Sequence, residues 1–71
     1  DMDIIDQSWS PDSMLVGVLD AIGNVRVIDG RSGEQLHEFR HLHAVSIAWS
    51  RVGDYLAVAD YFGGISLRST R

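Results

Sequence analysis

An internal repeat of 40 residues is the feature that most constrains the fold of this chain. A shift by 40 positions places Trp9-Ser10 on Trp49-Ser50 and keeps apolar, small and turn residues in phase without a gap. A fixed period of this length indicates one supersecondary unit that is repeated. Residues 33–43 lie between the copies, so the chain holds one complete unit and most of a second. The other matched pairs are Val18 and Val58, Asp20 and Asp60, Gly23 and Gly63, Val25 and Ile65, and Val27 and Leu67.

Each copy predicts short β-strands and tight turns, and no segment keeps helical periodicity for three turns. The first strands end in turn residues such as Ser, Pro, Asp and Gly. The second strands are almost unbroken apolar runs, which favours strands covered on both faces. The fourth strand is more polar, as expected at an exposed sheet edge. The expected strands are 4–9, 14–19, 25–27 and 34–40 in the first copy, and 44–49, 55–59 and 65–67 in the second.

Glycines mark the turn between the second and third strands of each copy. Gly23-Asn24 and Gly63-Gly64 supply residues that tolerate a positive φ where a short hairpin needs them. We therefore expect Gly23 and Gly63 in the left-handed region, with a structural role.

The chain is too small to complete a core by itself. With 71 residues, folding alone would bury only about 60% of the surface of the unfolded chain. The sequence has no cysteine for a disulfide and no Cys/His array of zinc spacing. The composition, 45% hydrophobic and 23% charged, is nevertheless that of a folded domain. We expect neighbouring units to complete the fold, and the isolated chain not to be a stable monomer.

Charge and hydropathy exclude several classes of partner. The formal net charge is −4 and the sequence has no lysine, so the basic surface of a nucleic-acid or anionic-membrane binder is missing. The longest apolar run, 14–19, is far shorter than a membrane span, and the first residues form no signal-like segment. We expect protein or peptide partners, no direct nucleic acid, no membrane, and an intracellular location, cytoplasmic or nuclear.

The order and spacing of three segments resemble the WD-repeat β-propeller family. Residues 9–13, Trp-Ser-Pro-Asp-Ser, are similar to the family's aromatic-Ser-Pro-Asp-Gly turn. Residues 23–29, Gly-Asn-Val-Arg-Val-Ile-Asp, resemble its Gly-Thr-Val-Arg-Val-Trp-Asp third strand, and residues 33–39 look like the opening of its fourth strand. The resemblance covers nearly the whole chain.

Several positions depart from the family pattern. They would form its buried Asp-His-Ser-Trp hydrogen-bond network, so we expect these blades to be held by apolar packing instead. Phe62 stands where the family has a buried Asp, and we expect it to point inward and fill the gap. The replacements are Ile28 and Arg68 for the Trp, Ile22 and Phe62 for the Asp, Val18 and Val58 for the Ser or Thr, and Leu42 or Arg40 for the His.

The resemblance implies an all-β fold, a β-propeller fragment of antiparallel four-stranded blades. Residues 1–40 would form a complete blade and residues 41–71 a second blade lacking its last strand. The implied function is a protein interaction scaffold in a multi-subunit intracellular complex, not an enzyme. The alternatives are a propeller that binds or hydrolyses a small molecule or sugar, a self-assembling pair of blades, and a small two-sheet sandwich that folds by itself.

Ionisable residues form no recognisable catalytic or metal-binding pattern. His37, His41 and His43 straddle a strand end and a loop, with no carboxylate or thiol at matching spacing. Asp20 and Asp60 occupy equivalent hairpin positions in separate units, which favours a role in turns over acid/base chemistry. We expect no catalytic residue, no metal and no cofactor.

The hairpin between the second and third strands of the second copy is the candidate partner-binding end, because propellers resembling this chain often bind partners there. Tyr61 should point outward and present an apolar ring with a polar tip. The candidate partner-binding residues are Tyr61, Asp60, Asp20, His41 and His43. The expected structural residues are Trp9, Trp49, Gly23, Gly63, Ile28 and Phe62, with both tryptophans in the core.

Overall fold

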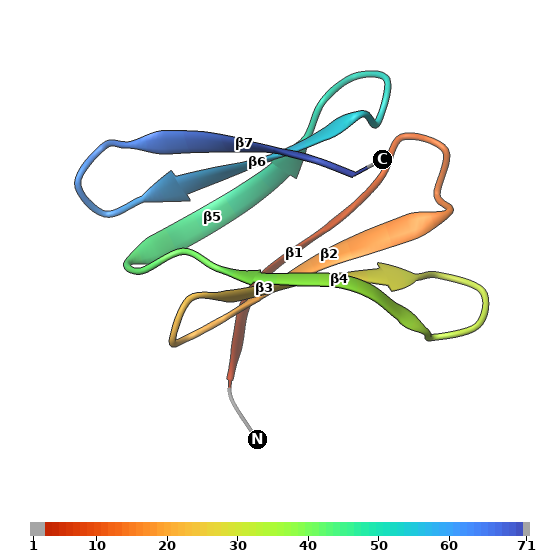
Figure 1. The fold of residues 1–71 in the computed structure, drawn as a ribbon, viewed down its shortest axis with the longest axis horizontal. Coiled ribbons are helices and arrows are strands. Elements are labelled where there is room, and N and C mark those ends of the chain that lie inside the picture. Colours follow the sequence, from red (N-terminus) through yellow and green to blue (C-terminus); the bar gives the residue numbers. More distant parts are fainter. Residues whose placement is uncertain (1–2, 71) are drawn as a thin grey trace.

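The computed structural model describes residues 3–70 and contains seven antiparallel strands in two sheets, with no helix among these residues (Figure 1). The all-β prediction is confirmed, while Asp1, Met2 and Arg71 of the predicted blades lie outside the described residues. The first sheet has the order β1-β2-β3-β4 and the second β5-β6-β7. The strands are β1 (Ile4–Trp9), β2 (Leu15–Asp20), β3 (Asn24–Asp29), β4 (Gln35–Arg40), β5 (Ala44–Trp49), β6 (Tyr55–Asp60) and β7 (Ile65–Ser69).

The strand boundaries follow the sequence pattern closely. β1 and β5 have the predicted bounds, and each other strand differs by one or two residues at one end or at both. β2 begins at Leu15 and not at Met14 because Ser10 closes the preceding turn. The Ser10 N–H donates to the Leu15 carbonyl at 2.9 Å, and the Leu15 N–H donates to Ser10 Oγ at 3.0 Å.

The 40-residue repeat is a repeat of hydrogen bonds as well as of strands. The Ser50 N–H donates to the Tyr55 carbonyl at 2.9 Å and the Tyr55 N–H to Ser50 Oγ at 3.1 Å, which copies the turn at Ser10. β1 and β2 shift register between Ile4 and Asp6, and β5 and β6 shift at the equivalent place in the second copy. The two units therefore share their turns and their irregularities.

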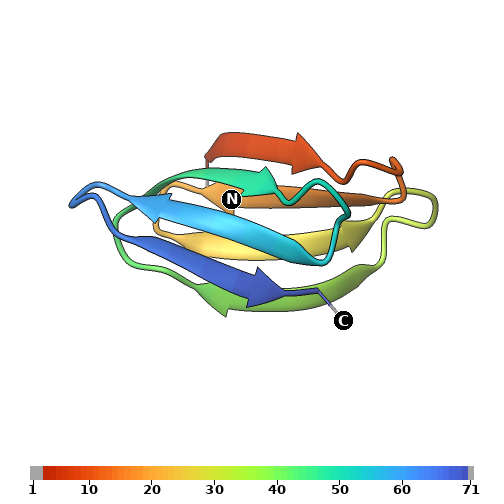
Figure 2. The ribbon, with the colours of Figure 1, turned by 90° about the horizontal axis from the view of Figure 1, so that it is seen from above.

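The two sheets stack face to face, with β5 lying against β1 and β2. In Figure 2 the strands of both sheets run in the same order from the top to the bottom of the view, β1 to β4 in one sheet and β5 to β7 in the other. Gly17 lets the sheets approach, because a Cβ there would lie 3.2 Å from both Ile47 Cδ1 and Leu56 Cδ2. The buried apolar residues form one core between the sheets: Leu19, Val25, Val27, Ala44, Ile47, Leu56 and Val58, with Leu15, Phe39 and Trp49 packed against it.

The sheets are packed through this apolar core, as expected, and polar contacts join them as well. The Ile47 N–H donates to Asp6 Oδ2 at 2.9 Å, and Trp49 Nε1 donates to the Ser8 carbonyl at 2.6 Å. These bonds satisfy groups that the contact between β1 and β5 would otherwise bury without partners.

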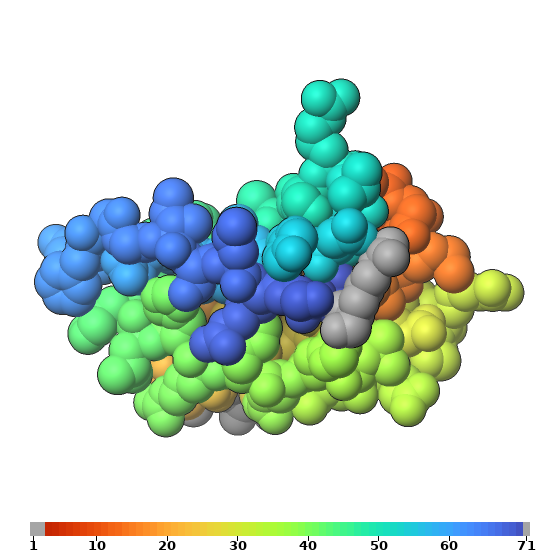
Figure 3. Space-filling model, turned by 45° about the horizontal axis from the view of Figure 1, so that its top comes forward, coloured from red at the N-terminus to blue at the C-terminus, as the bar shows by residue number. Residues whose placement is uncertain are grey.

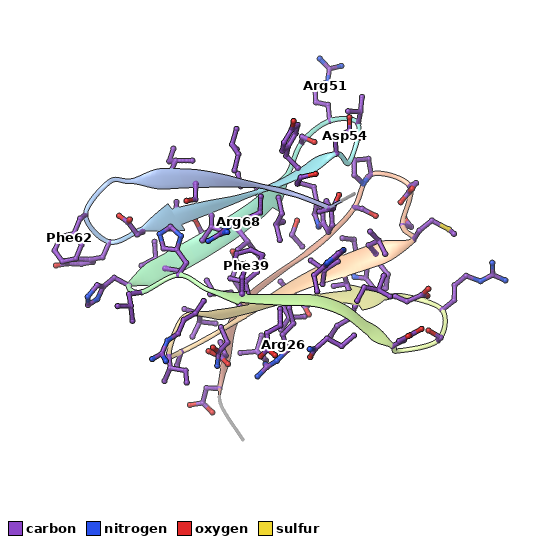
Figure 4. The ribbon with its side chains drawn as sticks, viewed as in Figure 1. Arg26, Phe39, Arg51, Asp54, Phe62 and Arg68 are labelled. Carbon is purple, nitrogen blue, oxygen red and sulfur yellow. The ribbon has the colours of Figure 1, made fainter. Side chains whose placement is uncertain are left out.

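A cation–π contact closes the other side of the interface, where Arg68 of β7 faces Phe39 of β4 (Figure 4). The Arg68 guanidinium carbon lies 4.6 Å from the centre of the Phe39 ring. Arg68 stands where the WD-repeat pattern has a Trp, and its position over a ring is favourable for a cation.

The prediction of a core position is wrong for Trp9. Its side chain is 52% exposed, whereas Trp49 is partly buried against the core. Trp9 lies on the outer face of the first sheet, and no second layer covers that face within residues 3–70. Its ring instead lies over Gly30, where a Cβ would come within 2.6 Å of it. Ile28, also expected to be structural, is half-buried.

Among residues 3–70, no helix has the length and apolar character needed to cross a membrane.

Candidate functional site: an aromatic cluster on the β6–β7 hairpin

Three connections gather at one end of the molecule: residues 21–23, 41–43 and 61–63, at the left of Figure 1. They include most of the residues predicted to bind a partner. Backbone hydrogen bonds tie each connection to a neighbouring one. The His41 N–H donates to the Gly23 carbonyl at 2.8 Å, and the Tyr61 N–H donates to the His43 carbonyl at 2.8 Å.

Asp60 builds the turn of the β6–β7 hairpin. Its Oδ1 accepts hydrogen bonds from the N–H groups of Phe62 at 2.9 Å and Gly64 at 2.8 Å. Gly63 has a φ of 86°, as predicted, and its N–H donates to the Asp60 carbonyl at 3.2 Å. An Asp side chain that accepts from the following backbone in this way holds a turn in one conformation.

His41 reaches the same carboxylate from the β4–β5 connection. Its Nε2 lies 3.2 Å from Asp60 Oδ2, and both side chains are mostly buried. The N–H of Gly64 and the hydrogen bond to His41 lower the pKa of Asp60 below its ordinary value, although partial burial opposes the shift. Asp60 and His41 therefore fix the connection to the hairpin, and both side chains are largely covered.

An Asp–His contact was not expected here. The WD-repeat pattern would place the Asp at Phe62 and the His at Leu42 or Arg40, and the structure uses Asp60 and His41 instead. No sequence signal links these two residues, because Asp60 ends β6 and His41 lies in the β4–β5 connection, 19 positions away.

Next to the Asp60 turn, three rings form a cluster, which we call the hairpin aromatic cluster: His43, Tyr61 and Phe62. The centre of the Phe62 ring lies 5.1 Å from that of His43 and 5.5 Å from that of Tyr61, both edge to face. Such a geometry is favourable for aromatic pairs. The tip of the hairpin projects at one end of the molecule (Figure 3), and Phe62 points away from the body (Figure 4).

The expectation that Phe62 points inward is wrong, because its side chain is 74% exposed. The inward position at the end of β6 belongs to Asp60, whose hydrogen bonds turn the chain and leave the next two side chains at the tip. Tyr61, which we expected to be exposed, is 77% exposed. Within residues 3–70, both aromatic side chains therefore face solvent, whereas we expected this of Tyr61 alone.

The equivalent β2–β3 hairpin has the same turn but a covered carboxylate. Asp20 is 0% exposed, so its prediction as a partner-binding residue is wrong. Its oxygens accept from the N–H groups of Ile22 and Asn24, both at 3.0 Å, and Arg26 Nη1 lies 3.5 Å away. Burial raises the pKa of Asp20, but these hydrogen bonds and the Arg26 charge outweigh it, so the net pKa lies below the ordinary value.

The site offers surface for contact and no enclosed volume for a small molecule. Residues 3–70 form no pocket and bring together no group of three side chains able to hold a metal ion. Of the predicted partner-binding residues, His43 and Tyr61 lie exposed together, His41 and Asp60 lie beneath them, and Asp20 lies on the other hairpin.

No protein-family model matches this chain, and a search of curated proteins finds no significant match.

Proposed function

We propose that this chain is a piece of a WD-repeat-like β-propeller that acts as a protein interaction scaffold, with the hairpin aromatic cluster as the contact for a protein or peptide partner. The propeller reading is supported by two stacked antiparallel sheets that repeat every 40 residues, with the same turns and register. In this reading residues 1–40 are one blade, and residues 41–71 are a second blade without its outer strand.

The observation that carries the binding role is the exposure of two adjacent aromatic side chains on an ordered turn. Exposed large rings that touch each other are unusual on a surface without a partner, and aromatic residues supply much of the binding energy in protein interfaces. The Asp60 turn and the His41 contact hold the backbone under Tyr61 and Phe62 in place. Less conformational entropy is then lost on binding.

The kind of partner follows from the chemistry of the cluster. Its rings fit an apolar groove, and the acidic chain around them, with a formal net charge of −4, favours a protein partner with a basic rim. We propose no nucleic-acid, membrane or cofactor role and no enzymatic activity. The compartment that fits these partners is intracellular, cytoplasmic or nuclear.

Site-specific cross-linking tests the proposal. A photoreactive amino acid at position 61 should capture a defined partner in native extracts, while the same group at Val52, which is equally exposed on the β5–β6 turn, should not. With that partner purified, Tyr61→Ala should weaken binding by about 1–2 kcal/mol, roughly tenfold, and Val52→Ala should not change it. Equal capture at positions 61 and 52, or unchanged binding by Tyr61→Ala, overturns the proposed role of the cluster.

A further inference from the structure

The two sheets pack through faces that are not equivalent in the 40-residue repeat, and each sheet leaves its other face open. Side chains alternate between the two faces of a strand, so each sheet has one inner and one outer face. The first sheet turns these residues of β2 and β3 toward the core: Leu15, Gly17, Leu19, Val25 and Val27. The second sheet turns these residues inward from β5, β6 and β7: Ile47, Trp49, Leu56, Val58 and Arg68.

A shift by 40 residues converts each inner face into the outer face of the other sheet. The inner face of the first sheet maps onto what we call the second-sheet outer face: Tyr55, Ala57, Ala59, Ile65 and Leu67. The inner face of the second sheet maps onto the first-sheet outer face: Gln7, Trp9, Val16, Val18 and Ile28. The contact between the sheets is thus head-to-tail. The two outer faces occupy positions equivalent to the two inner faces, and both are unpaired within residues 3–70.

Both outer faces have the character of an unpaired interface. Ile65 and Leu67 are 73% and 65% exposed, although each is apolar and each corresponds to a fully buried valine of the first sheet. On the first-sheet outer face Trp9 is half exposed, whereas its counterpart Trp49 packs against the core. Adjacent exposed apolar side chains of this kind mark association surfaces.

From this equivalence we propose that a second copy of this chain supplies the neighbouring blades of the proposed propeller, an inference that rests on the proposed function. The copy docks head-to-tail, and its first-sheet outer face covers the second-sheet outer face of its neighbour. The occupant is a second copy because the two faces carry, at equivalent positions of the 40-residue repeat, mostly apolar residues like those on the two sides of the contact that already exists within one chain. Gln7, which takes the place of Ile47, is the polar exception. A two-fold dimer would instead place like faces together, with no counterpart in the observed packing.

One pair of side chains keeps its combined size in this second contact. In the existing contact Gly17 lies against Leu56. In the proposed contact the equivalent pair is Ala57 and Val16, so one side gains a methyl group and the other loses a methylene. Changes that conserve volume across a packed surface are tolerated well.

Trp9 offers a hydrogen bond to the same contact. Trp49 Nε1 donates to the Ser8 carbonyl across the existing contact, and the equivalent bond would run from Trp9 Nε1 to the Ala48 carbonyl of the neighbouring copy. Within residues 3–70, Trp9 Nε1 donates no hydrogen bond. The indole N–H of a Trp that becomes buried in an interface gains from such an acceptor.

In a head-to-tail assembly, each end of a row of copies has one unpaired face. Such an assembly therefore adds further copies until it closes into a ring or extends as an open filament. It is separate from the hairpin aromatic cluster, which lies at the end of the strands and not on a sheet face. Loss of self-association would therefore leave the proposed partner contact at Tyr61 intact, and the two proposals fail independently.

Sedimentation equilibrium of the full chain tests the proposal. The wild type should sediment above its monomer mass of 7.9 kDa, with a mass that rises with concentration. Trp9→Asp blocks the first-sheet outer face and Ile65→Asp the second-sheet outer face, so each variant alone should be a monomer. The control Val52→Asp changes an apolar residue that is as exposed as Ile65 but lies on a turn outside both faces, and it should associate like the wild type.

Mixing the two blocked variants is the decisive step. Each retains one intact face of opposite kind, so an equimolar mixture should form a one-to-one dimer, which the separate variants do not form. Leu67→Asp and Val16→Asp repeat the test if circular dichroism shows that a first variant is unfolded. A monomeric wild type overturns the proposal, and so does a mixture that stays monomeric. Dimers that persist in one blocked variant reveal a two-fold contact and also overturn it.

Discussion

The β2–β3 and β6–β7 hairpins have the same turn but different surroundings. In each, an Asp at the end of a strand accepts N–H bonds from the residues two and four positions later, and a glycine three positions on has a positive φ. In the first hairpin the β4–β5 connection lies over the turn, and the carboxylate of Asp20 is fully buried. In the second, no segment of residues 3–70 lies over the tip, and the rings of Tyr61 and Phe62 face solvent.

This difference between the two hairpins shows that the local sequence determines the turn, whereas the role of the turn depends on which segment packs over it. The covered hairpin serves the junction between the two units, since the His41 N–H bonds to the Gly23 carbonyl. The open hairpin uses the same Asp to hold aromatic side chains outward. Comparing equivalent substitutions in the two hairpins therefore separates the contribution of the turn from the contribution of its cover.

The largest expected difference is at the hairpin glycines. A Cβ at Gly23 would lie 2.5 Å from the His41 carbonyl oxygen, a backbone atom, whereas a Cβ at Gly63 meets nothing within 4 Å. Both substitutions to Ala incur left-handed strain of about 1–2 kcal/mol, and Gly23→Ala adds a backbone displacement of about 1–3 kcal/mol. Denaturant unfolding at one fixed protein concentration should show Gly23→Ala as clearly the more destabilising. Equal losses would mean that the β4–β5 connection does not cover the first hairpin.

The next comparison concerns acid stability. The pKa values of Asp20 and Asp60 both lie below the ordinary 3.8, so the unfolded chain takes up protons first as the pH falls. The stabilisation is present in full above about pH 4 and is lost as the pH falls through the lowered values. His41→Ala should raise the pKa of Asp60 toward its ordinary value and leave that of Asp20 unchanged. Carboxyl titration by NMR measures both groups.

The control for this experiment is His37→Ala, which removes an exposed histidine of β4 that makes no contact with Asp60. It should leave both carboxyl titrations at their wild-type positions. A shifted Asp20 titration on removal of His41 would show that the two hairpins are electrostatically coupled, and an unshifted Asp60 titration would show that the His41 contact does not lower the pKa of Asp60.

Most of the fold was predictable because short sequence patterns determine its strands and turns. The turn after Trp9-Ser10, the glycines at 23 and 63 and the apolar runs each determine a strand or a turn over a few residues. Exposure was harder to predict. Trp9 was expected in the core because it ends a first strand matched to that of Trp49, and Phe62 because it stands where the WD-repeat pattern has a buried Asp. Burial instead depends on whether another layer lies over the position, which no local pattern encodes. The Asp60–His41 contact was missed for the same reason, since it joins two connections.

A smaller effect distinguishes the turns at the opposite end of the strands. Ser13 has a φ of 62° and its equivalent, Gly53, a φ of 82°, so the first copy holds a non-glycine residue in the left-handed region. Ser13→Gly relieves strain but makes the unfolded chain more flexible, and the net gain should be about 0.5 kcal/mol. Gly53→Ser should produce a loss of similar size. Thermal unfolding of the two reciprocal variants checks the signs, and two changes of the same sign would contradict the equivalence of these turns.

The smallest expected effect on folding is at the exposed cluster itself. Phe62→Ala would remove several kcal/mol if the ring filled the core, but a ring that faces solvent on a turn held by the Asp60 carboxylate has little buried area to lose. Tyr61→Ala and Phe62→Ala should both change the free energy of unfolding by less than about 0.5 kcal/mol, in contrast to Val25→Ala on the covered side, which removes a fully buried side chain. A Phe62→Ala loss as large as that of Val25→Ala would mean that the ring is covered in solution. The second hairpin would then resemble the first in its surroundings as well as in its turn, and its aromatic side chains would belong to packing and not to recognition.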